Sequence, residues 1–215
     1  YKDHTSNTIY ASFKIKKTKK DFLKDCYVII WTTTPWTIPV NRALAYDSKI
    51  KYSVIRLGKD KDIEHFKDKK IIIAKELVKR VSEECGFKNF QVLKEFSGND
   101  LKGTICSHPF IDIGYDYDVP MLEGNFVTLE QGTGIVHSAP SHGPDDFNLC
   151  LKHGIKASNT MNDSGIYSDE VPFFSGTHIF KADSKVIEKL SEHKSLLSND
   201  KLQHSFPHSW RSKAP

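Results

Sequence analysis

The stretch Y-V-I-I-W-T-T-T-P-W-T, residues 27–37, does most to decide the fold of this chain. Its apolar first half predicts a buried strand at 27–31. Three threonines follow, and the proline after them lacks an N–H, so the strand is expected to end there. Because side chains alternate along a strand, Thr32 and Thr34 should face one side and Thr33 the other. A buried strand that ends in hydroxyl groups between two tryptophans suggests the wall of a pocket.

A second polar cluster, G-T-G-I-V-H-S-A-P-S-H-G-P-D-D-F, occupies residues 132–147. We expect it to place His137 and Asp146 on the wall opposite the threonines. The threonine run alone would also fit an exposed strand face, because Thr favours strands. The flanking tryptophans and prolines, which an exposed face does not need, favour the pocket.

Asp145 and Asp146 open a predicted helix at 144–153, which Gly154 should end. Carboxylates in a first helical turn are stabilised by free N–H groups and by the helix dipole, by about 0.3–1 kcal/mol. Asp145 can fill that role alone, which leaves Asp146 available for a ligand cation. A carboxylate anchored at a helix N-terminus is expected to stay ionised, which suits the binding of an ammonium group.

Two other kinds of site compete with this pocket. G-T-G at 132–134 is similar to the start of a dinucleotide-binding loop, but His137 stands in place of the third glycine and a strand should follow. Gly134 is better explained by close backbone approach beside a pocket. His137 and His142 with the aspartates could hold a metal ion, yet their spacing fits no single helical face. A metal-dependent hydrolase is therefore the less favoured alternative.

The composition indicates a globular domain. Of 215 residues, 38% are hydrophobic and 27% are charged, and the net charge is +4. This charge permits an RNA partner, and lysine runs at 14–20 and 59–70 are expected as solvated surface or, alternatively, as contacts to a phosphate backbone. The four scattered cysteines form no C-x-x-C pair, which favours the cytoplasm over a disulfide framework or zinc ribbon. We expect no signal peptide and no membrane span, and the chain to be a fragment of a longer protein.

The remaining segments predict strands with a few helices. Short β-branched or aromatic runs predict strands at 9–15, 52–55, 71–74, 90–96, 126–129 and 135–138. Further helices are predicted at 75–85, ended by Gly86, and at 183–193, opened by Asp183 as a cap. Regular βαβ alternation is missing, so the expected fold class is α+β, with a β-barrel-rich core and a few peripheral helices.

The two polar clusters together resemble the editing domain of isoleucyl-tRNA synthetase, in its bacterial or organellar form. The resemblance rests on W-T-T-T-P-W-T at 31–37, on the Asn-Arg-Ala that follows at 41–43, and on the cluster at 132–147. Leucyl and valyl relatives typically carry Arg at the position of Thr34, which points to the isoleucyl branch. The run Q-H-S-F-P-H-S-W-R at 203–211 resembles the stretch that re-enters the synthetase catalytic domain. The resemblance implies a single inserted domain over 1–215, called connective polypeptide 1, with both ends leading into an absent catalytic domain.

The resemblance also implies roles for individual residues. Asp146 should bind the α-ammonium group of a misattached amino acid, and His137 should shape the pocket and exclude the larger side chain. Thr34, with Thr32 and Thr33, should line the pocket, hold the terminal adenosine of the tRNA or position the attacking water. The other substrate-binding candidates are Trp36, Asn41 and Gly134.

The implied activity is hydrolysis of the ester of Val-tRNA(Ile), and possibly of valyl-adenylate, with the terminal ribose hydroxyl helping to activate water. A pocket built for isoleucine cannot strongly reject valine, because one methylene contributes only about 1–3 kcal/mol, as is well known for this family of synthetases. A second, smaller site then removes the mistake.

The class I ATP-site motifs H-I-G-H and K-M-S-K-S do not occur, so no ligase activity is expected from this segment. No cofactor is expected in the domain, because ATP and Mg²⁺ are used by the catalytic domain of the parent enzyme. The expected partners are the 3′ end of tRNA(Ile) carrying valine, valyl-adenylate and the rest of the synthetase chain, with no membrane and as a monomer. The alternative is a module that binds the tRNA acceptor end and is inactive when isolated.

Overall fold

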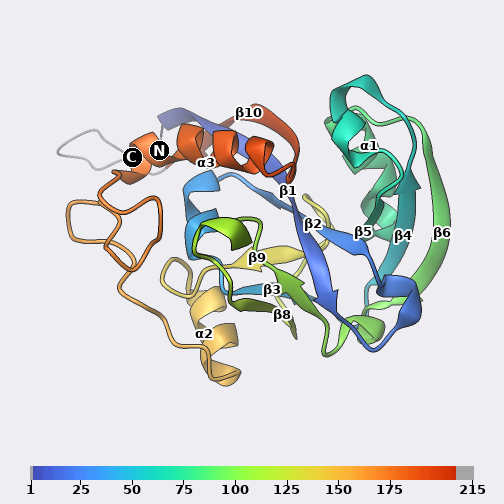
Figure 1. Cartoon of the computed structure of the whole chain (residues 1–215), viewed down its shortest axis with the longest axis horizontal. Coiled ribbons are helices and arrows are strands. Elements are labelled where there is room, and N and C mark those ends of the chain that lie inside the picture. The colour runs from blue at the N-terminus through green and yellow to red at the C-terminus, as the bar shows by residue number, and fades with distance from the viewer. Residues whose placement is uncertain (1, 207–215) are drawn as a thin grey trace.

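The computed structural model describes residues 2–206, which form one open mixed sheet with helices around it (Figure 1). The strands are β1 (Lys2–Lys17), β2 (Cys26–Thr32), β3 (Ala43–Tyr46), β4 (Lys51–Leu57), β5 (Lys70–Ala74), β6 (Phe90–Ser97), β7 (Ile105–Ser107), β8 (Asp118–Glu123), β9 (Val136–Ser138) and β10 (Leu196–Phe206). The α-helices are α1 (Val78–Cys85), α2 (Pro144–Lys152) and α3 (Ile179–Glu192), and the 3-10 helix used below is η2 (Pro35–Val40). Most of the predicted re-entry run at 203–211 lies outside the described residues.

The sheet follows the order β6-β4-β5-β2-β1-β7-β8-β3-β9, and β10 also pairs with β1. The β2–β5 and β3–β8 pairs are parallel, and the other pairs are antiparallel. Among the described strands, β6 and β9 end the path without pairing with each other, so the sheet is open. The predicted α+β class with a few peripheral helices is confirmed, but the core that was expected to be rich in β-barrel is an open mixed sheet.

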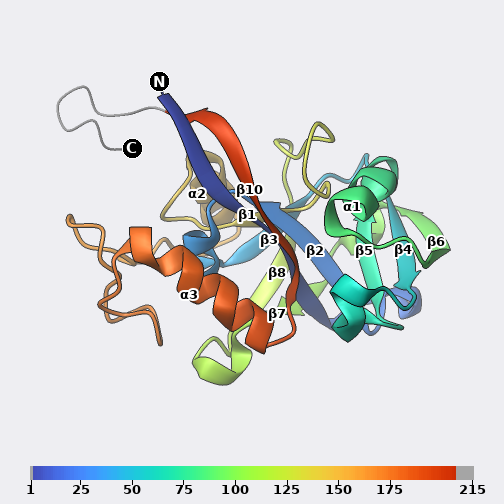
Figure 2. The same cartoon turned by 90° about the horizontal axis from the view of Figure 1, so that it is seen from above.

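The long strand β1 connects the parts of the sheet, since it pairs with β10, β2 and β7 in turn. Figure 2 shows β1 and β10 crossing the molecule together with α3 alongside them. Phe13 of β1 and Ile29 of β2 are both fully buried, and the register of the two strands places them on opposite faces of the sheet. Burial of a side chain of this size stabilises the fold by about 1.5–3 kcal/mol. The apolar face of α3, which includes Val186 and Leu190, completes this core.

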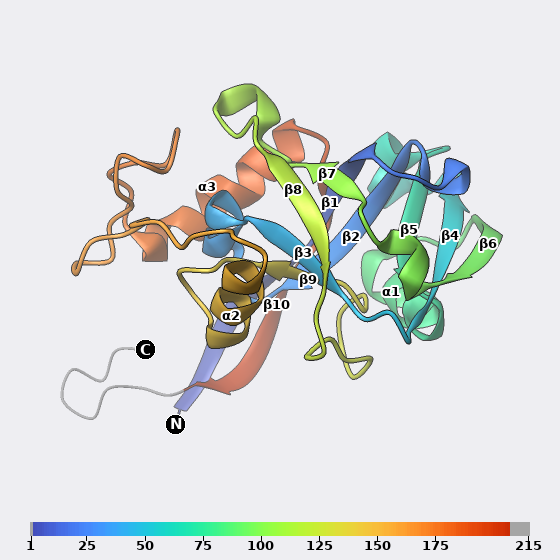
Figure 3. The ribbon, with the colours of Figure 1, turned by 90° about the horizontal axis from the view of Figure 1, so that it is seen from below.

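A second, smaller core holds α2 against β3 and the loop before β9 (Figure 3). Its members are Ala43, Ala45, Leu122, Val127, Leu149 and Cys150. This packing fixes the helix whose first turn carries Asp145 and Asp146. Strands β2 and β9, which carry parts of the two polar clusters, are separated by four strands in the sheet order and still approach each other in space.

Most predicted elements are confirmed, but two are wrong. The predicted strand at 126–129 is a turn and loop, whose Val127 packs into the small core without joining the sheet. The helix predicted to open at Asp183 begins at Ile179, and the His178 side chain caps it by accepting the Phe180 N–H. Strands β3, β7, β8 and β10 were not predicted. No helix within residues 2–206 is long and apolar enough to cross a membrane.

Candidate functional site

The threonine run forms a strand end followed by a tight turn, as predicted. Strand β2 ends at Thr32, and η2 begins at Pro35. Oγ1 of Thr32 lies 3.0 Å from Oγ1 of Thr34, so these two side chains face the same side. Thr37 closes the turn, because its N–H lies 2.9 Å and its hydroxyl 2.8 Å from the Thr34 carbonyl oxygen. The hydroxyl groups of Thr32, Thr34 and Thr37 therefore belong to one hydrogen-bonded network.

His137 is bonded to this turn through Thr37. Its Nε2 lies 2.9 Å from Thr37 Oγ1, and its Nδ1 lies 3.4 Å from Nδ2 of Asn41. Because the Thr37 hydroxyl donates to the Thr34 carbonyl, it accepts from the imidazole Nε2–H, and Nδ1 accepts from the Asn41 amide. Burial lowers the pKa of His137 to about 4, and the neighbouring His142 acts in the same direction. The imidazole is therefore neutral near pH 7, with both nitrogens occupied.

A pocket of about 270 Å³ opens beside these side chains. Thr32, Thr33, Gly134 and His137 line it together with Trp31 and Phe126. Gly134 has a φ of +74°, and a Cβ there would lie 2.4 Å from the Cβ of Ala74. Only glycine fits this position without displacing β5, so the G-T-G segment can pass directly behind the pocket.

The other predicted residues lie outside this lining. Thr34 reaches the pocket wall through its bond to Thr32, and the buried Asn41 reaches it through His137. The Trp36 ring stands edge-on to the ring of His142, with centroids 5.0 Å apart. Thr34 and Asn41 therefore support the wall of the pocket without forming it, whereas the Trp36 ring contacts His142, which does not line the pocket.

Asp146, which was expected on the wall opposite the threonines, is not among the residues that line this pocket. Its Oδ2 accepts the backbone N–H of Ala139 at 3.0 Å, two residues beyond His137. Burial raises the pKa of Asp146, and this effect outweighs the opposing hydrogen bond from Ala139. Burial therefore opposes the helix N-terminus, which was expected to favour the ionised carboxylate. No Lys or Arg among residues 2–206 pairs with Asp146, so a cationic ligand would supply its missing counter-charge.

No protein-family model matches the chain, but individual proteins do. It is 60% identical over 215 residues to the isoleucine–tRNA ligase of Pelagibacter ubique, and 42% identical over 229 residues to that of Gluconobacter oxydans. Both alignments cover 100% of this chain. All 215 residues are homologous to a segment of isoleucine–tRNA ligases. The chain spans about a quarter of the length of these ligases, 23% and 24% respectively.

Solved structures show which part of a synthetase has this fold. The structure of GlLeuRS-CP1 matches 90% of this chain and 99% of its own, with a TM-score of 0.67 and 13% identity. The editing domain of the cytosolic leucyl-tRNA synthetase of P. falciparum matches 90% of this chain and 98% of its own, with a TM-score of 0.65 and 12% identity. The isoleucine–tRNA ligase segment therefore has the CP1 editing-domain fold, and the resemblance inferred from the two polar clusters is confirmed.

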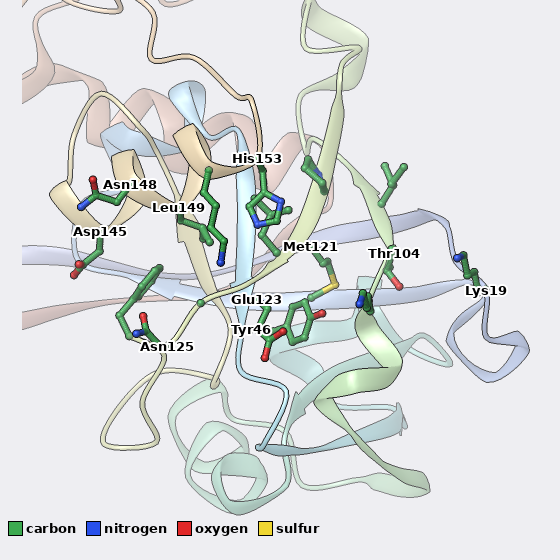
Figure 4. Close-up of a pocket in the computed structure, with 18 residues that line it drawn as sticks. Lys19, Tyr46, Thr104, Met121, Glu123, Asn125, Asp145, Asn148, Leu149 and His153 are labelled. Atoms are coloured by element: carbon green, nitrogen blue, oxygen red, sulfur yellow. The ribbon is translucent and has the colours of Figure 1, made fainter.

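The ligase segment has a second, larger hollow of about 1160 Å³ along β8 and α2 (Figure 4). None of the predicted site residues lines it. Asp145 lies at one end of this hollow and Lys19 at the other in Figure 4. Lys19, Lys102 and Lys152 line it without forming an ion pair with any described residue.

The residues considered as metal ligands or as a nucleotide-binding loop make other contacts in the structure. His142 Nε2 lies 2.9 Å from Oγ1 of Thr160, away from the Thr37 and Asn41 contacts of His137. In residues 2–206 no group of three or more His, Cys, Asp or Glu side chains is arranged to hold a metal ion. The G-T-G segment leads into β9, as predicted, and not into a helix.

Several supporting residues were not assigned to the site from the sequence. Thr37 belongs to the threonine run and could have been included with it. Tyr167 donates its hydroxyl to the Trp36 carbonyl, and Asp183 accepts the Trp36 N–H at 2.9 Å. Neither of these two lies near the threonines in sequence, so no local pattern indicates its role.

Proposed function

We propose that this segment hydrolyses valine esterified to tRNA(Ile), as the proofreading site of an isoleucine–tRNA ligase. The observation that carries the proposal is the small pocket lined by Thr32, Thr33 and a neutral His137. It occurs in a chain that is homologous to isoleucine–tRNA ligases and has an editing-domain fold. A volume of about 270 Å³ suits a small acyl group at the end of a larger ligand.

The proposed roles follow from the contacts. Asp146 receives the α-ammonium group of the valyl ester, because it is half-buried and has no cationic partner among the described residues. His137 acts through its shape, since both of its nitrogens are engaged by the turn. Thr32 and Thr33 offer hydroxyls to the attacking water and to the terminal adenosine. Thr34 fixes the position of Thr32.

The proposed reaction needs no side-chain nucleophile. Water adds to the acyl carbonyl carbon, and the bond from that carbon to the ribose oxygen breaks. The proton lost by water passes to the departing ribose oxygen, with the neighbouring ribose hydroxyl as the relay. The products are free valine and uncharged tRNA, and the protein contributes orientation and preorganised dipoles.

We propose valyl-adenylate as a further substrate, since it presents the same ammonium and acyl groups. The proposed partners are the 3′ end of tRNA(Ile) and the rest of the ligase chain, with ATP and Mg²⁺ used by its catalytic domain. The proposed setting is a cytoplasmic monomer, and no cofactor is assigned to this pocket.

The test is deacylation of purified Val-tRNA(Ile) by the full-length ligase and by the isolated segment, with Ile-tRNA(Ile) as the control. We expect the full-length ligase to release valine and to spare isoleucine. No release by the full-length ligase would refute the proposal. Release by the ligase but not by the segment would identify the segment alone as an acceptor-end binding module. Loss of release on chelation would favour the metal alternative.

A further inference from the structure

The peptide groups on either side of Trp36 are held by two residues from the C-terminal part of the chain. Oδ1 of Asp183 accepts the Trp36 N–H at 2.9 Å, across 147 positions of sequence. The hydroxyl of Tyr167 donates to the Trp36 carbonyl across 131 positions. Helix α3, which carries Asp183, lies along β1 next to η2 (Figures 1 and 2).

The Trp36 N–H needs a partner from elsewhere in the structure. Trp36 is the second residue of η2, and the first N–H groups of a helix have no acceptor within that helix. Thr34, at the N-cap position, makes no capping bond with its side chain. Asp183 therefore supplies the acceptor that the sequence at the start of η2 does not provide.

Asp183 has few other polar contacts. It is half-buried in α3, and its second oxygen makes only a long contact of 3.5 Å to Nδ2 of Asn7. No Lys or Arg among residues 2–206 forms an ion pair with it. Because a desolvated carboxylate is unfavourable without partners, its bond to Trp36 is the main contact that stabilises it there.

The held peptide group is directly connected to the pocket. Thr37 follows Trp36, and its hydroxyl bonds both the Thr34 carbonyl at 2.8 Å and Nε2 of His137 at 2.9 Å. A displacement of the Trp36 peptide therefore moves Thr37 and, through it, His137. Two residues further along η2, His108 Nε2 lies 2.9 Å from the Ile38 carbonyl oxygen, so a second distant side chain also contacts the backbone of η2.

Resting on the function proposed above, we propose that Asp183 is a positioning residue for proofreading. Through the Trp36 N–H it holds the threonine turn where Thr37 can bond His137. Asp183 does not touch the pocket itself, so it should affect the hydrolytic step more than the binding of tRNA.

The experiment compares Asp183→Ala and Asp183→Asn in the full-length ligase. Single-turnover hydrolysis of Val-tRNA(Ile) should slow about 10- to 100-fold in the Ala variant, the effect of a small misplacement of catalytic groups. The tRNA concentration for half-maximal rate should change little. Asp183→Asn should stay close to wild type, because its carbonyl oxygen still accepts the Trp36 N–H and Asn7 can rotate its amide to match.

Two controls separate positioning from general stability. Leu190→Ala opens a cavity under the same helix without removing the bond to Trp36, and it should keep its hydrolytic rate. Charging of tRNA(Ile) with isoleucine should be unchanged in all three variants, which shows that the rest of the enzyme is intact.

Full hydrolysis by Asp183→Ala would overturn the inference, and so would an equal loss in Asp183→Asn or in Leu190→Ala. If wild-type ligase does not hydrolyse Val-tRNA(Ile), the proposed function fails and this inference fails with it. An active wild type together with an active Asp183→Ala refutes the inference alone.

Discussion

The two hollows of this domain use their polar groups in opposite ways. In the pocket of about 270 Å³, the hydroxyl of Thr32 and both nitrogens of His137 are hydrogen-bonded to neighbouring residues. In the hollow of about 1160 Å³, Lys19, Lys102 and Lys152 have no ionic partner among the described residues. A site that acts on an ester needs groups already oriented before the substrate arrives. Volume alone would have selected the larger hollow, which none of the predicted site residues lines.

Two adjacent aspartates in the first turn of α2 also differ in whether their side chains are hydrogen-bonded within residues 2–206. Asp146 turns back to the Ala139 N–H near the small pocket, whereas Asp145 lines the large hollow. The two side chains have the same charge and neighbouring positions on α2, so they provide a matched pair for experiment.

The largest effect is expected for Asp146→Ala. Loss of the carboxylate that binds the ammonium group should slow deacylation of Val-tRNA(Ile) about 100-fold or more, because removing one partner of a desolvated charge pair costs about 2–5 kcal/mol. Asp145→Ala, the matched control, should leave the rate nearly unchanged. Steady-state and single-turnover deacylation measure both, and circular dichroism checks that each variant is folded. Slower deacylation by Asp145→Ala than by Asp146→Ala would contradict the assignment of the reaction to the small pocket.

A smaller effect is expected for Thr37→Val. The change leaves the buried Nε2–H of His137 without an acceptor, which should lower the free energy of unfolding by about 1–3 kcal/mol. Deacylation should slow about 10-fold as the imidazole shifts. The control is Thr104→Val in the large hollow, where a buried Thr bonds the hydroxyl of Thr18 at 3.2 Å. It should lose stability and keep its rate, and a similar loss of rate in both variants would argue against the pocket.

The mildest test is acidification. Burial lowers the pKa of His137 from an ordinary 6.5 to about 4, and that of His108 to about 3. Between these values and 6.5 the unfolded chain binds protons that the folded chain does not. The free energy of unfolding should therefore fall as the pH drops below 6.5, by up to about 1.4 kcal/mol per pH unit for each histidine. The raised pKa values of Asp146 and Asp183 act in the opposite direction, since these carboxyls bind protons more readily when folded.

Imidazole ¹⁵N chemical shifts give a direct readout for His137. They should show a neutral ring protonated on Nε2 at pH 5.5, and His137→Gln should flatten the dependence of unfolding on pH. Protonation of His137 with a midpoint near 6.5 would mean that its ring is not held as described.

The sequence predicted those features that depend on residues close together along the chain. The run at 27–37 indicated both the buried strand and its end before Pro35, because apolar periodicity and a missing N–H are local properties. The positive φ angles of Gly86 and Gly154 after α1 and α2 were likewise indicated by residue type. Local patterns therefore indicated the end of β2, the ends of α1 and α2, and four of the residues that line the small pocket: Thr32, Thr33, Gly134 and His137.

The errors came from contacts between distant segments. Asp183 suits the start of a helix by composition, yet its partner is the N–H of Trp36. The apolar residues at 126–129 were taken for a strand because nothing local shows that Val127 fills the small core from a loop. Strand β10 pairs with β1 through its backbone, and its mostly polar sequence has no clear alternation to predict it. The orientation of Asp146 depended on a loop position that spacing does not give.

The bonds to the threonine turn also constrain when the pocket can form. The turn at 32–37 precedes its partners in the chain, since His137, Tyr167 and Asp183 follow 100, 131 and 147 positions after the residues they bind. Contacts of such long sequence separation form slowly in folding and require most of the chain to be available. During synthesis, the turn at 32–37 therefore lacks its hydrogen bond to Asp183 until α3 has left the ribosome. Strand β10, which pairs with β1, follows α3 in the chain, so the pocket and the sheet are both completed only when the last described residues are available.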